Sequence, residues 1–65
     1  KNNLRVERAR LRLTQQELAQ QTGVTRQTIV AIEQGRFNPS VILALKMARV
    51  FNTSVETLFE LETTD

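Results

Sequence analysis

Residues Gln15 to Gly35 read QQELAQQTGVTRQTIVAIEQG and contain both glycines of the 65-residue chain. Gly35 ends the stretch, whereas Gly23 lies in its middle, between two runs that both have helical spacing of apolar residues. Glycine adopts a positive φ without steric cost, so Gly23 marks the end of one helix and the approach to a second. The stretch therefore predicts two short helices joined by a sharp turn.

Polar residues that accept backbone N–H bonds mark where these helices begin. Thr14 and Glu17 have the spacing of a capping box, which predicts a helix over about 15–21. Thr25 can cap the next helix, which is expected over 25–34. Both starts agree with the position of the turn.

The apolar residues of this stretch have the spacing that a helix-turn-helix needs. Ala19 supplies a small side chain where the two helices cross, and four aliphatic residues can hold the crossing angle: Leu18, Val24, Ile29 and Ile32. The positions left to face outward are Arg26, Gln27, Thr28, Val30 and Ala31. Arginine and glutamine can form paired hydrogen bonds with guanine and adenine edges, and a threonine methyl can contact thymine. The pattern favours DNA binding over a plain helical hairpin whose polar residues merely face water.

Three further helices are expected outside this stretch. Asn3 can cap a first helix over about 4–12, with Leu4 and Leu11 on one face. Pro39 or Ser40 begins a helix that continues to Phe51.

A second capping box, from Thr53 to Glu56, opens a short helix to about Leu61. No segment alternates with a period of two. The predicted fold class is all-α: a compact five-helix bundle, in which 1–65 form a single DNA-binding domain with the helix-turn-helix at about 15–34.

Composition excludes several kinds of protein. The chain has no Cys and no His, so it offers neither a disulfide nor a zinc site built on thiolate or imidazole. No apolar run reaches the roughly 18 residues of a membrane span. An enzyme is disfavoured because the usual nucleophiles and proton shuttles are missing. We expect no metal, no cofactor, no membrane association and no small-molecule ligand, and a reducing cytoplasm as the location.

Charge is unevenly distributed along the chain. Residues 1–49 contain all nine Lys and Arg against three acids, whereas residues 50–65 contain four acids and no base. A net charge of +6 in the first part and −4 in the second is consistent with a surface that binds a polyanion.

The chain resembles the phage-repressor/Cro-type helix-turn-helix regulators, also called the XRE family, over about residues 3–61. The matching pieces are Arg8, Leu13–Ala19, Gly23–Thr25, Arg26–Ile29, Ile32–Glu33, Gly35 and Pro39–Ser40. The resemblance is to very short prokaryotic members that are little more than a DNA-binding domain.

The resemblance implies roles for the matching positions. Four residues would face base edges: Arg26, Gln27, Thr28 and Ala31. Five would contact the DNA backbone: Gln15, Gln16, Thr25, Arg36 and Asn38. Arg8 and Glu33 would form a structural ion pair that ties the first helix to the third.

The helix after Pro39 has two apolar stripes. Val41, Ala44, Leu45 and Ala48 follow helical spacing and are expected to form the core face. Leu43, Met47 and Val50 form a second stripe, which is interpreted as a dimer interface together with Phe59 or Leu61; the alternative is a helix buried nearly all round.

These observations favour a sequence-specific transcriptional regulator, a homodimeric repressor that binds double-stranded DNA at a palindromic operator with helix 25–34 in the major groove. The alternative is an antitoxin-like subunit or another protein-interaction module on the same fold.

Overall fold

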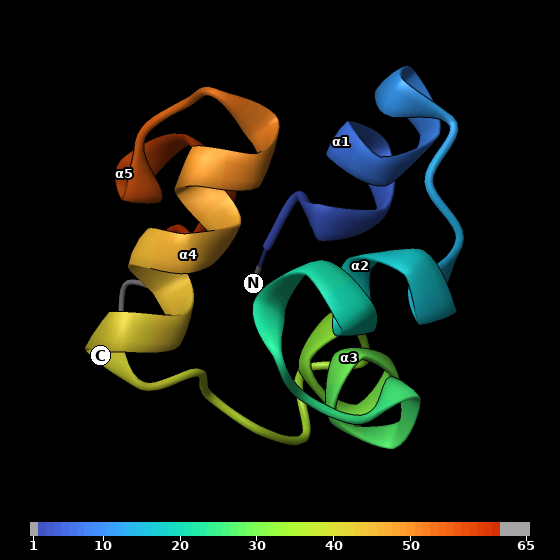
Figure 1. The fold of residues 1–65 in the computed structure, drawn as a ribbon. Coiled ribbons are helices and arrows are strands. Elements are labelled where there is room, and N and C mark those ends of the chain that lie inside the picture. Colours follow the sequence, from blue (N-terminus) through green and yellow to red (C-terminus); the bar gives the residue numbers. More distant parts are fainter. Residues whose placement is uncertain (1, 62–65) are drawn as a thin grey trace.

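Five α-helices joined by short connections make up the fold, shown in Figure 1. The computed structural model describes residues 2–61. In chain order the helices are α1 (Leu4–Leu11), α2 (Gln15–Thr22), α3 (Arg26–Glu33), α4 (Val41–Phe51) and α5 (Val55–Leu58). The all-α, five-helix fold class predicted from the sequence is confirmed. Across the described residues, every helix is too short or too polar to cross a membrane.

The helices enclose one small core. α2 packs against α3 and α4, and α4 also contacts α5 and α1, so α4 joins the two parts of the molecule (Figure 1). The core residues come from all five helices: Leu4, Leu18, Ala19, Ile29, Ile32, Leu43, Met47, Ala48, Phe51 and Leu58. Each fully buried Leu or Ile contributes about 1.5–3 kcal/mol by leaving water.

Side-chain oxygens cap α2, α4 and α5. Thr14 and Glu17 form the predicted capping box at the start of α2. Ser40 Oγ accepts the Leu43 N–H at 3.1 Å and starts α4. The capping box predicted from Thr53 to Glu56 is wrong, because Ser54 is the cap and its Oγ accepts the N–H of Thr57 at 3.1 Å.

The side-chain cap predicted for α1 is also wrong. Asn3 occupies the N-cap position, but its side chain does not bond the first turn of α1. Its Nδ2 donates instead to the Thr57 carbonyl at 2.9 Å. The Leu4 N–H is bonded by Asn2 Oδ1 at 3.3 Å. Leu4 is fully buried, whereas Leu11, expected on the same buried face, is 42% exposed.

The fifth helix is one turn shorter than the sequence predicts. It ends at Leu58, and Phe59 is extended, with φ −127° and ψ 125°. Phe59 forms an isolated antiparallel bridge with Asn2, and the Asn3 N–H donates to the Leu58 carbonyl at 2.8 Å. The pairing of the two chain ends replaces the last helical turn.

The two stripes predicted on α4 are assigned to the wrong faces. Leu43 and Met47, expected at a dimer interface, are buried in the core at 8% and 0% exposure. Val50 and Phe59 are half-buried and pack against that core. Val41 and Leu45, expected in the core, are 75% and 56% exposed.

The helix is rotated relative to that assignment because α1 and α2 pack on one side of it and α5 on another. The buried face consequently lies between the two predicted stripes. It takes Ala44 and Ala48 from one stripe and Leu43 and Met47 from the other.

Candidate nucleic-acid interface

The turn between α2 and α3 is held by local hydrogen bonds. Gly23 ends α2 with φ +76°, and the Val24 N–H returns to the Ala19 carbonyl at 3.1 Å. An added Cβ at Gly23 would meet nothing within 4 Å, so the residue is needed for its dihedral angles and not for space. Two residues later Thr25 Oγ1 accepts the N–H of Thr28 at 3.2 Å and starts α3.

The buried face of α3 fixes its orientation against α2. Ile29 and Ile32 of α3 are no more than 1% exposed, as are Leu18 and Ala19 of α2. Close packing of short aliphatic chains around one alanine sets a single crossing geometry. The outward face of α3 is thereby presented on a rigid support.

None of the α3 residues expected to face outward is buried. Arg26 and Gln27 are exposed in the first turn, whereas Thr28 and Ala31 are half-exposed. The Thr28 hydroxyl lies 3.1 Å from that of Thr25, and this hydrogen bond does not involve the Thr28 methyl group. The first turn of α3 thus offers a guanidinium and an amide to a ligand.

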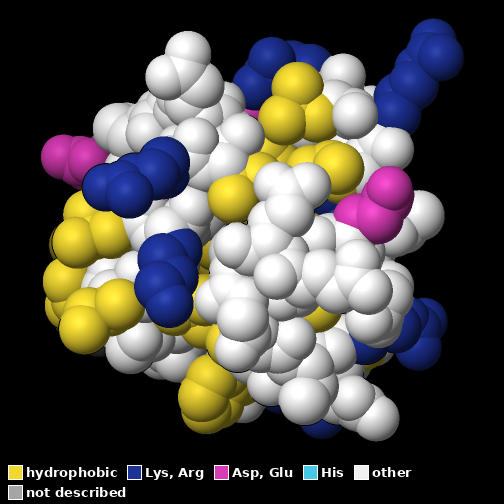
Figure 2. Space-filling view, viewed as in Figure 1, with side chains coloured by type: hydrophobic (Ala, Val, Ile, Leu, Met, Phe, Trp, Pro, Cys, Tyr) yellow, Lys and Arg dark blue, Asp and Glu magenta, His cyan; other side chains and the backbone are white. Residues whose placement is uncertain are grey.

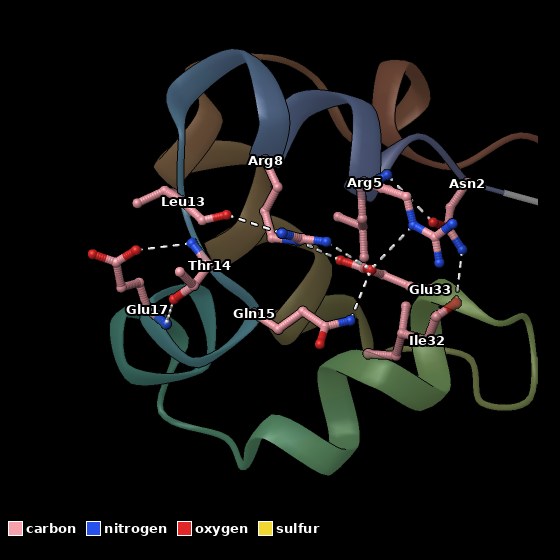
Figure 3. A network of polar contacts seen from close by, with 10 residues as sticks. Asn2, Arg5, Arg8, Leu13, Thr14, Gln15, Glu17, Ile32 and Glu33 are labelled. Atoms are coloured by element: carbon pink, nitrogen blue, oxygen red, sulfur yellow. Dashed lines mark hydrogen bonds and ion pairs between the residues drawn. The ribbon is translucent and has the colours of Figure 1, made fainter.

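A buried carboxylate ties α1, α2 and α3 together, as Figure 3 shows. The Glu33 side chain is 1% exposed and accepts from Arg8 Nε at 2.7 Å and from Arg8 Nη2 at 3.1 Å. Gln15 Nε2, from the first turn of α2, donates to the same carboxylate at 3.2 Å. Arg8 Nη1 also donates to the Leu13 carbonyl at 2.9 Å. The ion pair expected between Arg8 and Glu33 is present, and it holds the start of α2 against the end of α3.

Opposing effects act on the pKa of Glu33. Burial alone would raise this pKa, but the hydrogen bonds from Arg8 and Gln15 and the nearby charges of Arg8 and Arg5 bring it below its ordinary value. The carboxylate is therefore ionised at neutral pH. The pKa of Glu17 is lowered as well, by the backbone and the hydroxyl of Thr14 in the capping box.

The loop after α3 exposes the two residues expected to contact phosphates. Arg36 and Asn38 are both exposed, and Arg36 Nε donates to the Gln34 side chain at 2.7 Å. The end of α3 is held by Asn2, whose Nδ2 donates to the Ile32 carbonyl at 2.8 Å (Figure 3). Sequence reasoning missed this contact, because no local pattern connects residues thirty positions apart.

The other residues expected at the DNA backbone lie at helix starts. Gln16 and Thr25 are exposed at the beginnings of α2 and α3, and Gln15 is half-buried because its amide is bonded to Glu33. On the face that Figure 2 shows, the basic side chains are scattered and do not form one continuous stripe. Two of the four acids expected in an acidic tail, Glu62 and Asp65, lie outside the described residues.

Comparison with known proteins places this geometry in a family. The model of the helix-turn-helix family matches residues 4–58. An HTH-type transcriptional regulator of Archaeoglobus fulgidus is 54% identical over 52 residues, which cover 80% of this chain and 73% of that protein. YgzD of Bacillus subtilis, also an HTH-type transcriptional regulator, is 45% identical over 62 residues, or 95% and 94% of the two chains.

Solved structures agree with this assignment. The restriction-modification controller protein C.AhdI from Aeromonas hydrophila superposes with a TM-score of 0.78 at 32% identity, covering 86% of this chain and 85% of that one. The hypothetical transcription factor NHTF from Neisseria gives a TM-score of 0.78 at 31% identity over 85% of this chain, but this chain spans only 62% of NHTF. The resemblance stated from the sequence is confirmed: the chain belongs to the helix-turn-helix family and is a transcriptional regulator with a helix-turn-helix DNA-binding domain.

Proposed function

We propose that the chain is a sequence-specific repressor that binds a palindromic operator as a homodimer, with α3 in the major groove. The observation that carries the proposal is the first turn of α3. It exposes Arg26 and Gln27, while Ile29 and Ile32 hold the helix against the core. A rigidly mounted helix with such side chains at its exposed start is suited to reading base edges.

In this proposal one group of residues contacts the bases and another contacts the DNA backbone. Arg26, Gln27, Thr28 and Ala31 read bases. Gln15, Gln16, Thr25, Arg36 and Asn38 contact the DNA backbone and fix the position of α3. Base contacts determine sequence preference, whereas phosphate contacts add affinity without it.

Repression needs nothing beyond occupancy of the operator. A DNA-bound domain can block a promoter without a cofactor, a metal or a small-molecule ligand. In this proposal residues 1–65 act as one DNA-binding domain in the prokaryotic cytoplasm. A palindromic site follows from two-fold symmetry, because each copy reads one half-site.

Selection of bound duplexes from a random DNA pool tests the proposal. We expect enrichment of a palindrome with half-sites about one helical turn apart, roughly 10 base pairs. Affinity for the selected site should fall with salt at a slope of about −0.9 per neutralised phosphate. A flat salt response, or a pool that remains random, would exclude DNA reading, and a transcription assay with the site inside a promoter distinguishes repression from activation.

A further inference from the structure

Two neighbouring asparagines before α1 bond different parts of the fold. Asn2 Nδ2 donates to the Ile32 carbonyl at the end of α3 at 2.8 Å, whereas Asn3 Nδ2 donates to the Thr57 carbonyl of α5 at 2.9 Å. The two side chains make the same kind of contact, in which an amide donates to a backbone carbonyl. Only the contact of Asn2 reaches α3, the second helix of the helix-turn-helix.

The backbone around Asn2 is held by the segment that follows α5. Asn2 pairs with Phe59 in an isolated antiparallel bridge, and the Asn3 N–H donates to the Leu58 carbonyl at 2.8 Å. The Asn2 side chain also accepts the Leu4 N–H through Oδ1 at 3.3 Å. Its Nδ2 therefore reaches the end of α3 from a fixed position (Figure 3).

The Ile32 carbonyl also anchors the loop that follows α3. It accepts the Gly35 N–H at 3.0 Å in addition to Asn2 Nδ2. The Arg36 N–H donates to the preceding carbonyl, that of Ala31, at 2.9 Å. The position of Arg36 thus follows from the last turn of α3, and Asn2 is bonded to that same turn.

The loop itself lies at the surface. All residues from 34 to 38 are exposed. A groove of about 730 Å³ lies between the loop and the chain around α5, and Asn2, Phe37 and Asn38 line it together. Segments with few buried contacts are the first to move in a folded protein. The course of the loop therefore depends on the end of α3, to which it is bonded.

We propose that Asn2 is a positioning residue for DNA binding, which holds the last turn of α3 so that Arg36 and Asn38 contact the DNA backbone. This role rests on the proposed function, in which those two residues contact phosphates. A hydrogen bond to a phosphate needs its two heavy atoms within about 2.7–3.2 Å, so a shift of about one ångström removes it. Loss of the Asn2 contact should therefore lower DNA affinity in a domain that stays folded.

Asn2→Asp removes this contact and keeps the others. An ionised carboxylate has the shape of the amide, but it donates no hydrogen bond to the Ile32 carbonyl. Its oxygen can still accept the Leu4 N–H, and a negative charge beside the start of α1 is favourable. The variant should remain folded, which circular dichroism checks.

Asn3→Asp is the matched control. It adds the same charge one residue later and also removes one amide donor, but that donor serves the Thr57 carbonyl of α5. Repulsion between the added charge and DNA is thus common to both variants. We expect Asn2→Asp to bind selected and random duplexes alike roughly fivefold more weakly than Asn3→Asp, a loss of about one hydrogen bond.

A double-mutant cycle distinguishes positioning from stability. The difference in DNA affinity between Asn2→Asp and Asn3→Asp should shrink to less than about twofold when Arg36→Ala and Asn38→Ala are already present. A purely structural role would give the same difference in both backgrounds. Additive losses, or equal affinities of Asn2→Asp and Asn3→Asp for DNA, would overturn the positioning role. Asn2→Ala and Asn3→Ala repeat the comparison without an added charge.

Amide hydrogen exchange without DNA separates this role from the proposed function. Gly35 shares the Ile32 carbonyl with Asn2, so the amides of Gly35 and Arg36 should exchange roughly fivefold faster in Asn2→Asp than in Asn3→Asp. Unchanged exchange would overturn the positioning role whatever the DNA result. If these amides respond but the wild-type chain binds no duplex, the proposed function is refuted and the hold of Asn2 on α3 remains.

Discussion

Removing Arg8 should destabilise the domain far more than removing a neighbouring arginine. Arg8→Ala takes two donors from Glu33, whose side chain is 1% exposed. Breaking such a pair from one side costs about 3–5 kcal/mol, because a buried charge is left uncompensated. Gln15 at 3.2 Å and Arg5 at 3.8 Å remain near the carboxylate, so we expect the lower end, about 3 kcal/mol.

Thermal unfolding measures this loss. In a domain of this size 1 kcal/mol corresponds to about 4–8 °C, so the Tm should fall by roughly 12–24 °C. Arg10→Ala is the matched control on the same helix. Arg10 is 54% exposed and pairs with Glu7 at 2.7 Å, and its removal should cost less than about 1 kcal/mol.

A double-mutant cycle identifies the cause. Arg8→Ala/Glu33→Ala should cost less than the sum of the single changes by about 1–3 kcal/mol, because no unpaired charge is left. Arg8→Lys keeps the charge but loses the bidentate contact, and its stability should lie between those of the wild type and Arg8→Ala. Equal losses for Arg8→Ala and Arg10→Ala, or strict additivity in the cycle, would refute the coupling.

Three further outcomes are expected. The pKa of Glu33 is lower in the folded state than in the unfolded state. Its ionised carboxylate therefore stabilises the fold above about pH 4.3, and this stabilisation is lost as the pH falls through the folded pKa. The free energy of unfolding of Glu33→Gln should consequently depend less on pH below about 5 than that of the wild type. Gln27→Ala should cost about 1–3 kcal/mol on a selected DNA site and little on random DNA, whereas Arg36→Ala should weaken binding to both alike; equal losses for Gln27→Ala on both DNAs would remove α3 as the reading helix. Gly23→Ala should raise the free energy of the fold by about 1–2 kcal/mol through its positive φ alone, and a neutral result in urea unfolding would contradict that reading.

Local signals predicted much of the fold. The capping box at Thr14, the positive φ at Gly23 and the cap at Thr25 each depend on a few neighbouring residues, and all three appear where the sequence places them. Such positions are readable because the partner of each group lies within one turn of the chain. The outward face of α3 was predictable for the same reason.

Contacts between distant segments were not predictable. Asn2 bonds the end of α3, and Asn3 bonds the Thr57 carbonyl, so neither serves only the helix that it precedes. The extended geometry of Phe59 depends on this pairing of chain ends. A local sequence pattern does not indicate which distant carbonyl a side-chain amide will bond.

The wrong assignment on α4 has a different cause. Its sequence, VILALKMARVF, is polar only at Lys46 and Arg49, so hydrophobic periodicity gives no unique inward direction. Packing by α1, α2 and α5 decides the direction and buries Leu43 and Met47. Met47→Glu would therefore unfold the domain, and it cannot report on association.

The same composition leaves apolar residues on both sides of α4. A helix with one buried face normally has polar residues on the other, since water solvates that side. α4 keeps Val41, Ile42 and Leu45 exposed although the core of its own chain is already complete without them. Hydrophobic periodicity therefore does not distinguish the buried face of α4 from its exposed face, and only packing against the neighbouring helices decides between them.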